Sequence, residues 1–152
     1  MKNPIINLTH TTFKCRQYEK TAAFYRDILE LKNVFTLRNK DGSPDIGYFK
    51  IADKEFIELL NQKYEGENKL LSQQFVSLIV EDIYEAARSM ESKGVVLYRE
   101  PDINCAYDVP YLDCLKPDRT NSYAFFVRDP EGNFVEIKQY TKVSLEVLTD
   151  HL

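Results

Sequence analysis

The chain has no tryptophan, and among its 152 residues it has only two histidines and three cysteines. The cysteines are Cys15, Cys105 and Cys114. Their count is odd and their spacings match no zinc-knuckle pattern, so we interpret them as reduced structural thiols. The histidines are His10 and His151, which leaves few imidazole groups for any metal site.

Long apolar runs and a patch of one charge sign are also missing. No run approaches the ~20 apolar residues that span a bilayer, and Met1 to Pro4 contain no apolar signal segment. The net charge is -4, with acidic and basic residues interspersed, which argues against a nucleic-acid partner. We therefore expect a cytoplasmic protein without a membrane or nucleic-acid partner. The length and the 43% apolar content are sufficient for one domain, residues 1–152, with a real core.

The chain consists of two halves in which the predicted elements follow the same order. Apolar and β-branched spacing predicts for the first half a strand, a helix and three strands, at 5–13, 19–31, 33–38, 46–51 and 55–60. A polar linker at 61–69 follows. The second half is predicted to have a strand, a helix ended by Gly94 and three strands, at 74–80, 83–93, 95–98, 122–128 and 133–140. This repeat predicts an α+β fold of two tandem βαβββ modules, at about 5–60 and 73–140.

Two segments stand outside the repeat. The connection at 99–121 carries three prolines and two cysteines. Such a long loop is either a lid or pocket wall or a solvated surface excursion, and the sequence favours neither. The last residues, about 142–151, predict a short helix that docks through its apolar side chains, Val143, Leu145, Val147 and Leu148.

A β-hairpin is predicted at 125–137. Asp129, Pro130, Gly132 and Asn133 form the turn between two apolar runs. The second run contains one carboxylate, Glu136, between Val135 and Ile137, and burying a carboxylate costs free energy unless something pairs with it. A metal ion is one such partner. Tyr123 and Phe125, which share a face of the first strand, are candidates to face a pocket.

Several segments resemble the glyoxalase/bleomycin-resistance/extradiol-dioxygenase superfamily, the vicinal oxygen chelate proteins. They are His10 to Phe13 with Lys20 to Leu31, Val80 to Ile83, and Arg128 to Asn133 with Glu136. Glu30 stands where the family usually has glycine. The resemblance implies two βαβββ modules whose sheets curl into an open barrel around one pocket, and it implies a homodimer.

The resemblance also implies a metal site. In metal-dependent members, single ligands project from the first and last strand of each module. The matching positions here are His10, Glu58 and Glu136, for a divalent ion such as Zn, Ni, Co, Mn or Fe. Alternation along a strand places Glu58 on one face with Phe56 and Leu60. Glu58 could instead pair with Lys50, Lys54 or Lys138.

The fourth position of that site holds Phe75, where the family usually has histidine. Phenylalanine cannot bind a metal. A one-residue bulge would be needed to turn the neighbouring Gln74 inward.

Two functions remain open at this point. The first is a lyase or isomerase resembling lactoylglutathione lyase, with Glu136, or failing that Glu58, as general base and His10 as a fixed metal ligand. The second is a metal-free binding protein resembling bleomycin-resistance proteins, whose pocket holds an aromatic or cationic small molecule. An extradiol dioxygenase is disfavoured because its iron site needs a second histidine.

Overall fold

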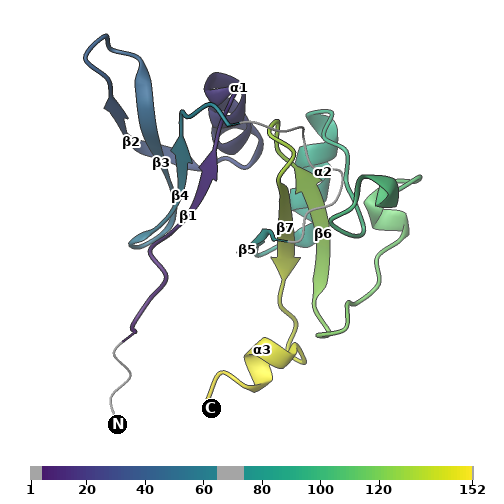
Figure 1. The fold of residues 1–152 in the computed structure, drawn as a ribbon. Coiled ribbons are helices and arrows are strands. Elements are labelled where there is room, and N and C mark those ends of the chain that lie inside the picture. Colours follow the sequence, from purple (N-terminus) through teal and green to yellow (C-terminus); the bar gives the residue numbers. More distant parts are fainter. Residues whose placement is uncertain (1–4, 65–73, 152) are drawn as a thin grey trace. The chain divides into compact units, whose positions relative to one another are not determined.

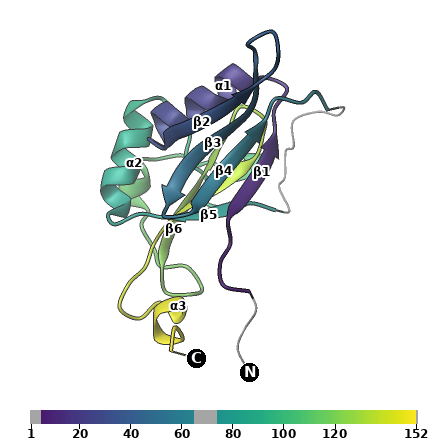
Figure 2. The ribbon, with the colours of Figure 1, turned by 90° about the vertical axis from the view of Figure 1, so that its left-hand side faces the viewer.

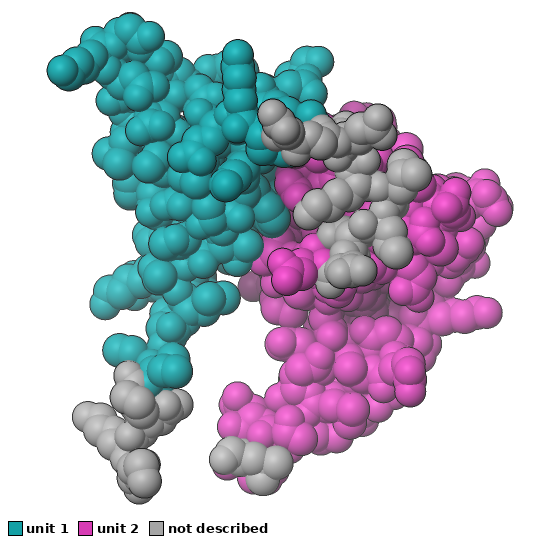
Figure 3. Space-filling model, viewed as in Figure 1, with its two compact units in different colours: residues 1–67 teal, residues 68–152 magenta. Residues whose placement is uncertain are grey.

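The computed structural model describes residues 5–64 and 74–151, and the chain divides into two compact units (Figure 3). Unit 1 is Met1–Glu67 and unit 2 is Asn68–Leu152. The division falls within the predicted linker at 61–69, part of which lies outside the described residues, as does position 73 at the predicted start of module two. Each unit contains one open mixed sheet with helices, so the predicted α+β class is confirmed.

Unit 1 follows the predicted βαβββ order. Its sheet has the strand order β1-β4-β3-β2, and only β1 and β4 run parallel (Figures 1 and 2). The helix α1 continues directly into a π-helical turn, η1. The elements are β1 His10–Lys14, α1 Tyr18–Ala23, η1 Phe24–Ile28, β2 Lys32–Arg38, β3 Pro44–Ala52 and β4 Glu55–Leu60.

The two faces of the unit 1 sheet differ in burial. Ile57 and Leu59 of β4 are fully buried, and α1 packs against this strand. Tyr25 of η1 is also fully buried and its ring lies 6.3 Å from that of Phe49, the strand neighbour of Ile57. Because strand side chains alternate between faces, Glu58 lies on the face opposite the helix.

Unit 2 has a three-stranded sheet with the order β5-β7-β6, in which β5 and β7 are parallel. The buried side chains Val135 and Ile137 of β7 lie on the face that α2 covers. Asp82 caps α2 by accepting from two backbone N–H groups, and Gly94 ends it with a φ of +77°. The elements are β5 Val76–Ile79, α2 Ile83–Ser92, β6 Tyr123–Arg128 and β7 Phe134–Gln139.

The strand predicted at 95–98 is wrong. Only Tyr98 pairs with the sheet, through one bridge to Phe126 of β6. The neighbouring backbone groups pair instead with the following loop, since Tyr107 N–H donates to the Leu97 carbonyl and Arg99 N–H to the Cys105 carbonyl. The chain therefore turns away from the sheet after one residue.

The connection at 99–121 is not a solvated excursion. It forms two short 3-10 turns, η2 Ile103–Cys105 and η3 Tyr111–Asp113. Tyr111 is 1% exposed, and its ring lies 5.0 Å from that of Phe125. This burial raises the pKa of the Tyr111 hydroxyl far above its ordinary value, and nearby charges add to the shift. The loop is thus packed onto the sheet of unit 2.

Three boundaries differ from prediction. The first strand begins at His10 rather than residue 5, the predicted helix at 19–31 ends at Ile28, and the C-terminal helix, α3 Leu145–Leu148, has only four residues. The apolar side chains predicted to dock are 44–58% exposed, because buried Ser144 and the ion pair of Glu146 hold this segment instead. In the part of the chain that the structure describes, no helix combines the length and apolar character of a membrane span.

Candidate functional site

Glu58 is the centre of a polar cluster on the face of unit 1 opposite α1. Strand pairing places Thr12 of β1 and Tyr48 of β3 on either side of it. The Thr12 hydroxyl donates to Glu58 Oε1 at 2.9 Å, and the Tyr48 hydroxyl donates to Glu58 Oε2. His10 Nε2 lies 3.8 Å from Glu58 Oε1. The structure therefore brings together two of the three predicted ligands, His10 and Glu58.

Aromatic rings surround this carboxylate. The Tyr48 ring stacks on Phe35 with 4.4 Å between centroids, and it meets Phe56 and His10 edge-on at 5.7 and 5.8 Å. The hydrogen bond to Glu58 raises the pKa of Tyr48, and burial and the carboxylate charge act in the same direction. We call this surface the Glu58 face, and its members are His10, Thr12, Phe35, Tyr48, Phe56 and Glu58.

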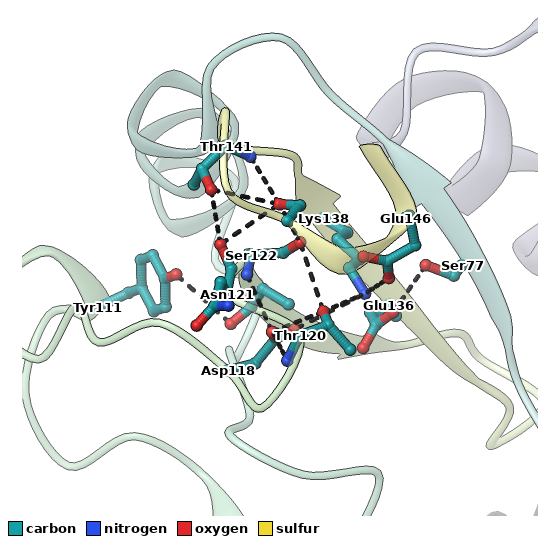
Figure 4. Close-up of polar contacts among 12 residues, drawn as sticks. Ser77, Tyr111, Asp118, Thr120, Asn121, Ser122, Glu136, Lys138, Thr141 and Glu146 are labelled. Atoms are coloured by element: carbon teal, nitrogen blue, oxygen red, sulfur yellow. Dashed lines mark hydrogen bonds and ion pairs between the residues drawn. The ribbon is translucent and has the colours of Figure 1, made fainter. Parts of the chain in front are cut away.

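Glu136 has the corresponding place in unit 2, on the face opposite α2. Ser77 of β5 lies across from it and donates its hydroxyl to Glu136 Oε1 at 2.7 Å (Figure 4). Lys138 follows two residues later on the same strand, and the charge of Glu136 is among the causes that raise its pKa. Glu136 thus has a cationic neighbour on its own face.

The strand registers make the two units directly comparable. Thr12 pairs with Glu58 and Ser77 pairs with Glu136, so a hydroxyl faces a carboxylate in both. His10 lies two residues before Thr12, and Phe75 lies two residues before Ser77. Phe75 therefore has in unit 2 the place of His10 in unit 1, and its ring lies 5.0 Å from that of Phe126. β5 pairs with β7 without a register shift, so the bulge that Gln74 would need is absent from 76–79.

The two units also differ in the residue that pairs with the carboxylate from the antiparallel neighbouring strand. Tyr48 faces Glu58, and Phe126 faces Glu136. Phe126 has no hydroxyl to donate to the carboxylate. The second unit thus repeats the strand register of the Glu58 face with phenylalanine at two of its polar positions.

The donor set within each unit is incomplete for a metal centre. Protein sites of this kind use three or four side-chain ligands. Unit 1 offers His10 and Glu58, whose oxygens already accept from two hydroxyls, and unit 2 offers Glu136 beside Ser77. Within residues 5–64 and 74–151, no three histidine, cysteine or acidic side chains gather into a ligand group. The predicted three-ligand site draws on both units and stays a prediction.

Phe125 is not where the sequence suggested. It is fully buried against Tyr111, on the face of the unit 2 sheet that carries Ile137 rather than Glu136. The hairpin residue on the Glu136 face is Phe126. The one-residue difference matters because alternation along β6 reverses the face.

Sequence reasoning missed a polar network around Lys138 (Figure 4). The Lys138 ammonium donates to Glu146 at 2.6 Å and to Thr120 at 3.2 Å, and it lies 3.7 Å from Asp118. Burial alone would lower the pKa of Lys138, but the hydrogen bond to Glu146 and the nearby carboxylates outweigh it and raise the pKa. The available signal was a lysine in β7 directly after the buried Ile137, since a buried ammonium requires anionic partners.

The comparisons with known proteins agree with this architecture. Residues 7–137 match the model of the Glyoxalase/Bleomycin resistance protein/Dioxygenase superfamily, and the chain belongs to that family. No curated protein sequence matches the chain.

Solved structures share its fold. A glyoxalase family protein from Bacillus anthracis has a TM-score of 0.68 at 17% identity, covering 93% of this chain and 100% of the other. An antibiotic binding protein from a Streptomyces species has a TM-score of 0.64 at 15% identity, with 92% and 100% covered. Lactoylglutathione lyase from Agrobacterium tumefaciens has a TM-score of 0.62 at 19% identity, with 90% and 96% covered.

Proposed function

We propose that this member of the superfamily is a small-molecule-binding protein whose site works without a metal ion. The observation that carries the proposal is the register comparison of the two units. Where unit 1 has His10 and Tyr48, unit 2 has Phe75 and Phe126. An aromatic pair at these positions suits an organic ligand and offers no ligand atom to a metal.

The surroundings of Glu58 support the same function. Each oxygen of Glu58 already accepts a hydroxyl, from Thr12 and from Tyr48. These bonds stabilise the carboxylate in the absence of a metal. Among the structural relatives, the Streptomyces protein is named for binding an antibiotic, which is a role of this kind.

A second function, a metal-dependent lyase or isomerase, is favoured by one contact. His10 Nε2 and Glu58 Oε1 are 3.8 Å apart on one face of the sheet. Two ligand atoms at this separation are close enough to bind the same ion. A divalent ion held by His10, Glu58 and Glu136 would polarise vicinal oxygens of a substrate. Glu136, or failing that Glu58, would then act as the general base. The Agrobacterium relative is named as such a lyase.

Elemental analysis separates the two functions. Purified protein is exposed to Ni²⁺, Zn²⁺ and Co²⁺, desalted and analysed beside the His10→Ala variant. We expect far less than one ion per chain in both, and no isomerisation of the hemithioacetal of methylglyoxal and glutathione. Stoichiometric metal in the native protein that His10→Ala loses would overturn the proposal and establish the lyase-type site.

We propose, on the family resemblance, that the protein is a homodimer, and, on the absence of long apolar runs in the sequence, that it is cytoplasmic. Its partners would be a small-molecule ligand and a second copy of the chain.

A further inference from the structure

We propose that the Glu58 face binds the cationic group of an organic molecule, such as a protonated or quaternary amine. This inference rests on the small-molecule-binding function proposed above and names the chemical class of its ligand. Three features of the face support it: the negative charge of Glu58, the aromatic rings around this carboxylate, and the solvent exposure of the face.

The charge of Glu58 has no lysine or arginine partner within unit 1. Among the described residues of that unit, its one ion-pair contact is His10. Lys50, two residues beyond Tyr48 on β3, is exposed and makes no such contact. Of the lysines considered from the sequence, Lys50 and Lys54 of unit 1 thus form no ion pair with Glu58.

Three acidic groups of unit 2, in contrast, lie near a lysine. Glu146 and Asp118 both contact the Lys138 ammonium, and Glu136 lies on the same strand face as that lysine. A positive charge is thus built into the protein near each of these carboxylates. Within unit 1 no lysine or arginine pairs with Glu58, and a positive charge on a ligand would stabilise this partly buried carboxylate.

The aromatic rings define what kind of cation fits. The Tyr48 ring lies within ring-contact distance of both Phe35 and Phe56, on the face that carries the carboxylate. The faces of such rings attract ammonium groups, most strongly where water is excluded. A small hydrated metal ion makes poor use of three rings, whereas an alkylated ammonium contacts both the rings and the carboxylate.

The face is accessible to a ligand. Phe35 is 46% exposed, and the side chains of His10 and Glu58 are 32% and 13% exposed. An ionised carboxylate has about four lone-pair sites, and the hydroxyls of Thr12 and Tyr48 occupy only two. The remaining capacity of Glu58 is available to a donor from the ligand.

Two probes test this inference by calorimetry at neutral pH: benzyltrimethylammonium and neutral benzyl alcohol. We expect the cation to bind more tightly, with affinity about tenfold lower in Glu58→Gln and several-fold lower in Phe35→Leu. Benzyl alcohol should bind Glu58→Gln and the native protein alike. Glu58→Gln retains an amide oxygen for the Tyr48 hydroxyl, and thermal melting confirms that each variant is folded.

The matched control is Glu19→Gln, which removes an exposed carboxylate of α1 on the other side of the sheet. It should leave the affinity for both probes unchanged. Equal affinity for the two probes, cation binding that Glu58→Gln leaves intact, or binding of neither probe would overturn the inference. Binding of a metal ion that is lost in His10→Ala would instead overturn the proposed function. Failure of the inference and failure of the proposed function are therefore distinguishable.

Discussion

Glu58 and Glu136 occupy the same place in the two halves of the chain, and only their neighbours differ. Each accepts a hydroxyl from the first strand of its unit, Thr12 or Ser77. Glu58 also accepts the Tyr48 hydroxyl, where Glu136 faces Phe126. The chemistry of a carboxylate in this fold is therefore set by two or three side chains on adjacent strands.

The bond between Tyr48 and Glu58 has a direct spectroscopic consequence. An ionised acceptor stabilises the protonated phenol, so the pKa of Tyr48 is raised above its ordinary value of 10.0. In Glu58→Gln the acceptor is neutral, and we expect the pKa of Tyr48 to fall towards that value. A pH titration of the tyrosine ring carbons by NMR measures it. Tyr107, whose pKa is raised first by burial in unit 2, should titrate unchanged, and an unaltered Tyr48 would contradict the bond.

Gly47 of β3 is required by a close contact on the other face of the unit 1 sheet. A Cβ atom at this position would overlap the Tyr18 hydroxyl and lie 3.3 Å from the Phe49 ring. We expect Gly47→Ala to lower the free energy of unfolding by ~1–3 kcal/mol, the usual cost of overpacking. Urea denaturation measures it.

The companion variant Tyr18→Phe removes the atom that a methyl group would strike. Combining it with Gly47→Ala should restore part of the lost stability. A Gly47→Ala protein as stable as the native chain would show that the sheet accommodates the methyl group without strain.

The C-terminal segment is held by polar contacts rather than by its apolar side chains. Ser144 is fully buried, with its hydroxyl 2.7 Å from that of Ser122. Glu146 pairs with Lys138 (Figure 4). A helix of four residues has little stability of its own. Its position therefore depends on these anchors.

The ion pair between Glu146 and Lys138 should make the free energy of unfolding depend on pH. The hydrogen bond from Lys138 lowers the pKa of Glu146 below its ordinary value of 4.5. The pair thus stabilises the folded chain above about that pH, and the contribution is lost as the pH falls through the lowered pKa. We expect Glu146→Gln to reduce the free energy of unfolding by ~1 kcal/mol or less at pH 7, because the carboxylate is partly exposed.

Denaturation of the native and variant proteins over a range of pH measures this contribution. The difference between them should disappear in acid. Asp150→Asn, which neutralises an exposed carboxylate in the same segment, is the control and should have no such effect. A difference that persists at low pH would mean that the pair does not account for it.

The molecule as a whole consists of two units with the same strand register and different outer segments. Unit 2 adds the packed loop at 99–121 and α3, and it lacks a full strand at 95–98. Apolar side chains are exposed at both ends of the described chain, at Ile5, Ile6 and Leu8 and along α3. Exposed apolar clusters commonly mark protein contacts, and this supports the expected homodimer.

Light scattering after size exclusion tests the homodimer. We expect twice the mass of one chain, and a shift towards the monomer when Leu145 and Leu148, 47% and 51% exposed, are both replaced by serine. Val109→Ser, at a similarly exposed loop position (49%), should leave the mass unchanged. A native protein with the mass of a single chain would contradict the expectation.

The sequence by itself determined the family, the α+β class and the side of the strand on which the key carboxylates lie. Apolar alternation is a local property, so β4 was bounded correctly at Glu55–Leu60 and Glu58 was assigned to the face it occupies. The family resemblance, rather than alternation, placed Phe75 where the family usually has histidine, and the strand registers give it the place of His10 in unit 2.

Only the tertiary structure decided what each carboxylate contacts. Thr12 is 46 residues from Glu58 in sequence, and Asp118 is 20 residues from Lys138, so no local pattern links them. The strand predicted at 95–98 failed because the Leu97 carbonyl accepts from Tyr107 in the loop that follows, and only Tyr98 pairs with the sheet. Periodicity fixes the face of a side chain, whereas its partners depend on which distant strand or loop lies beside it.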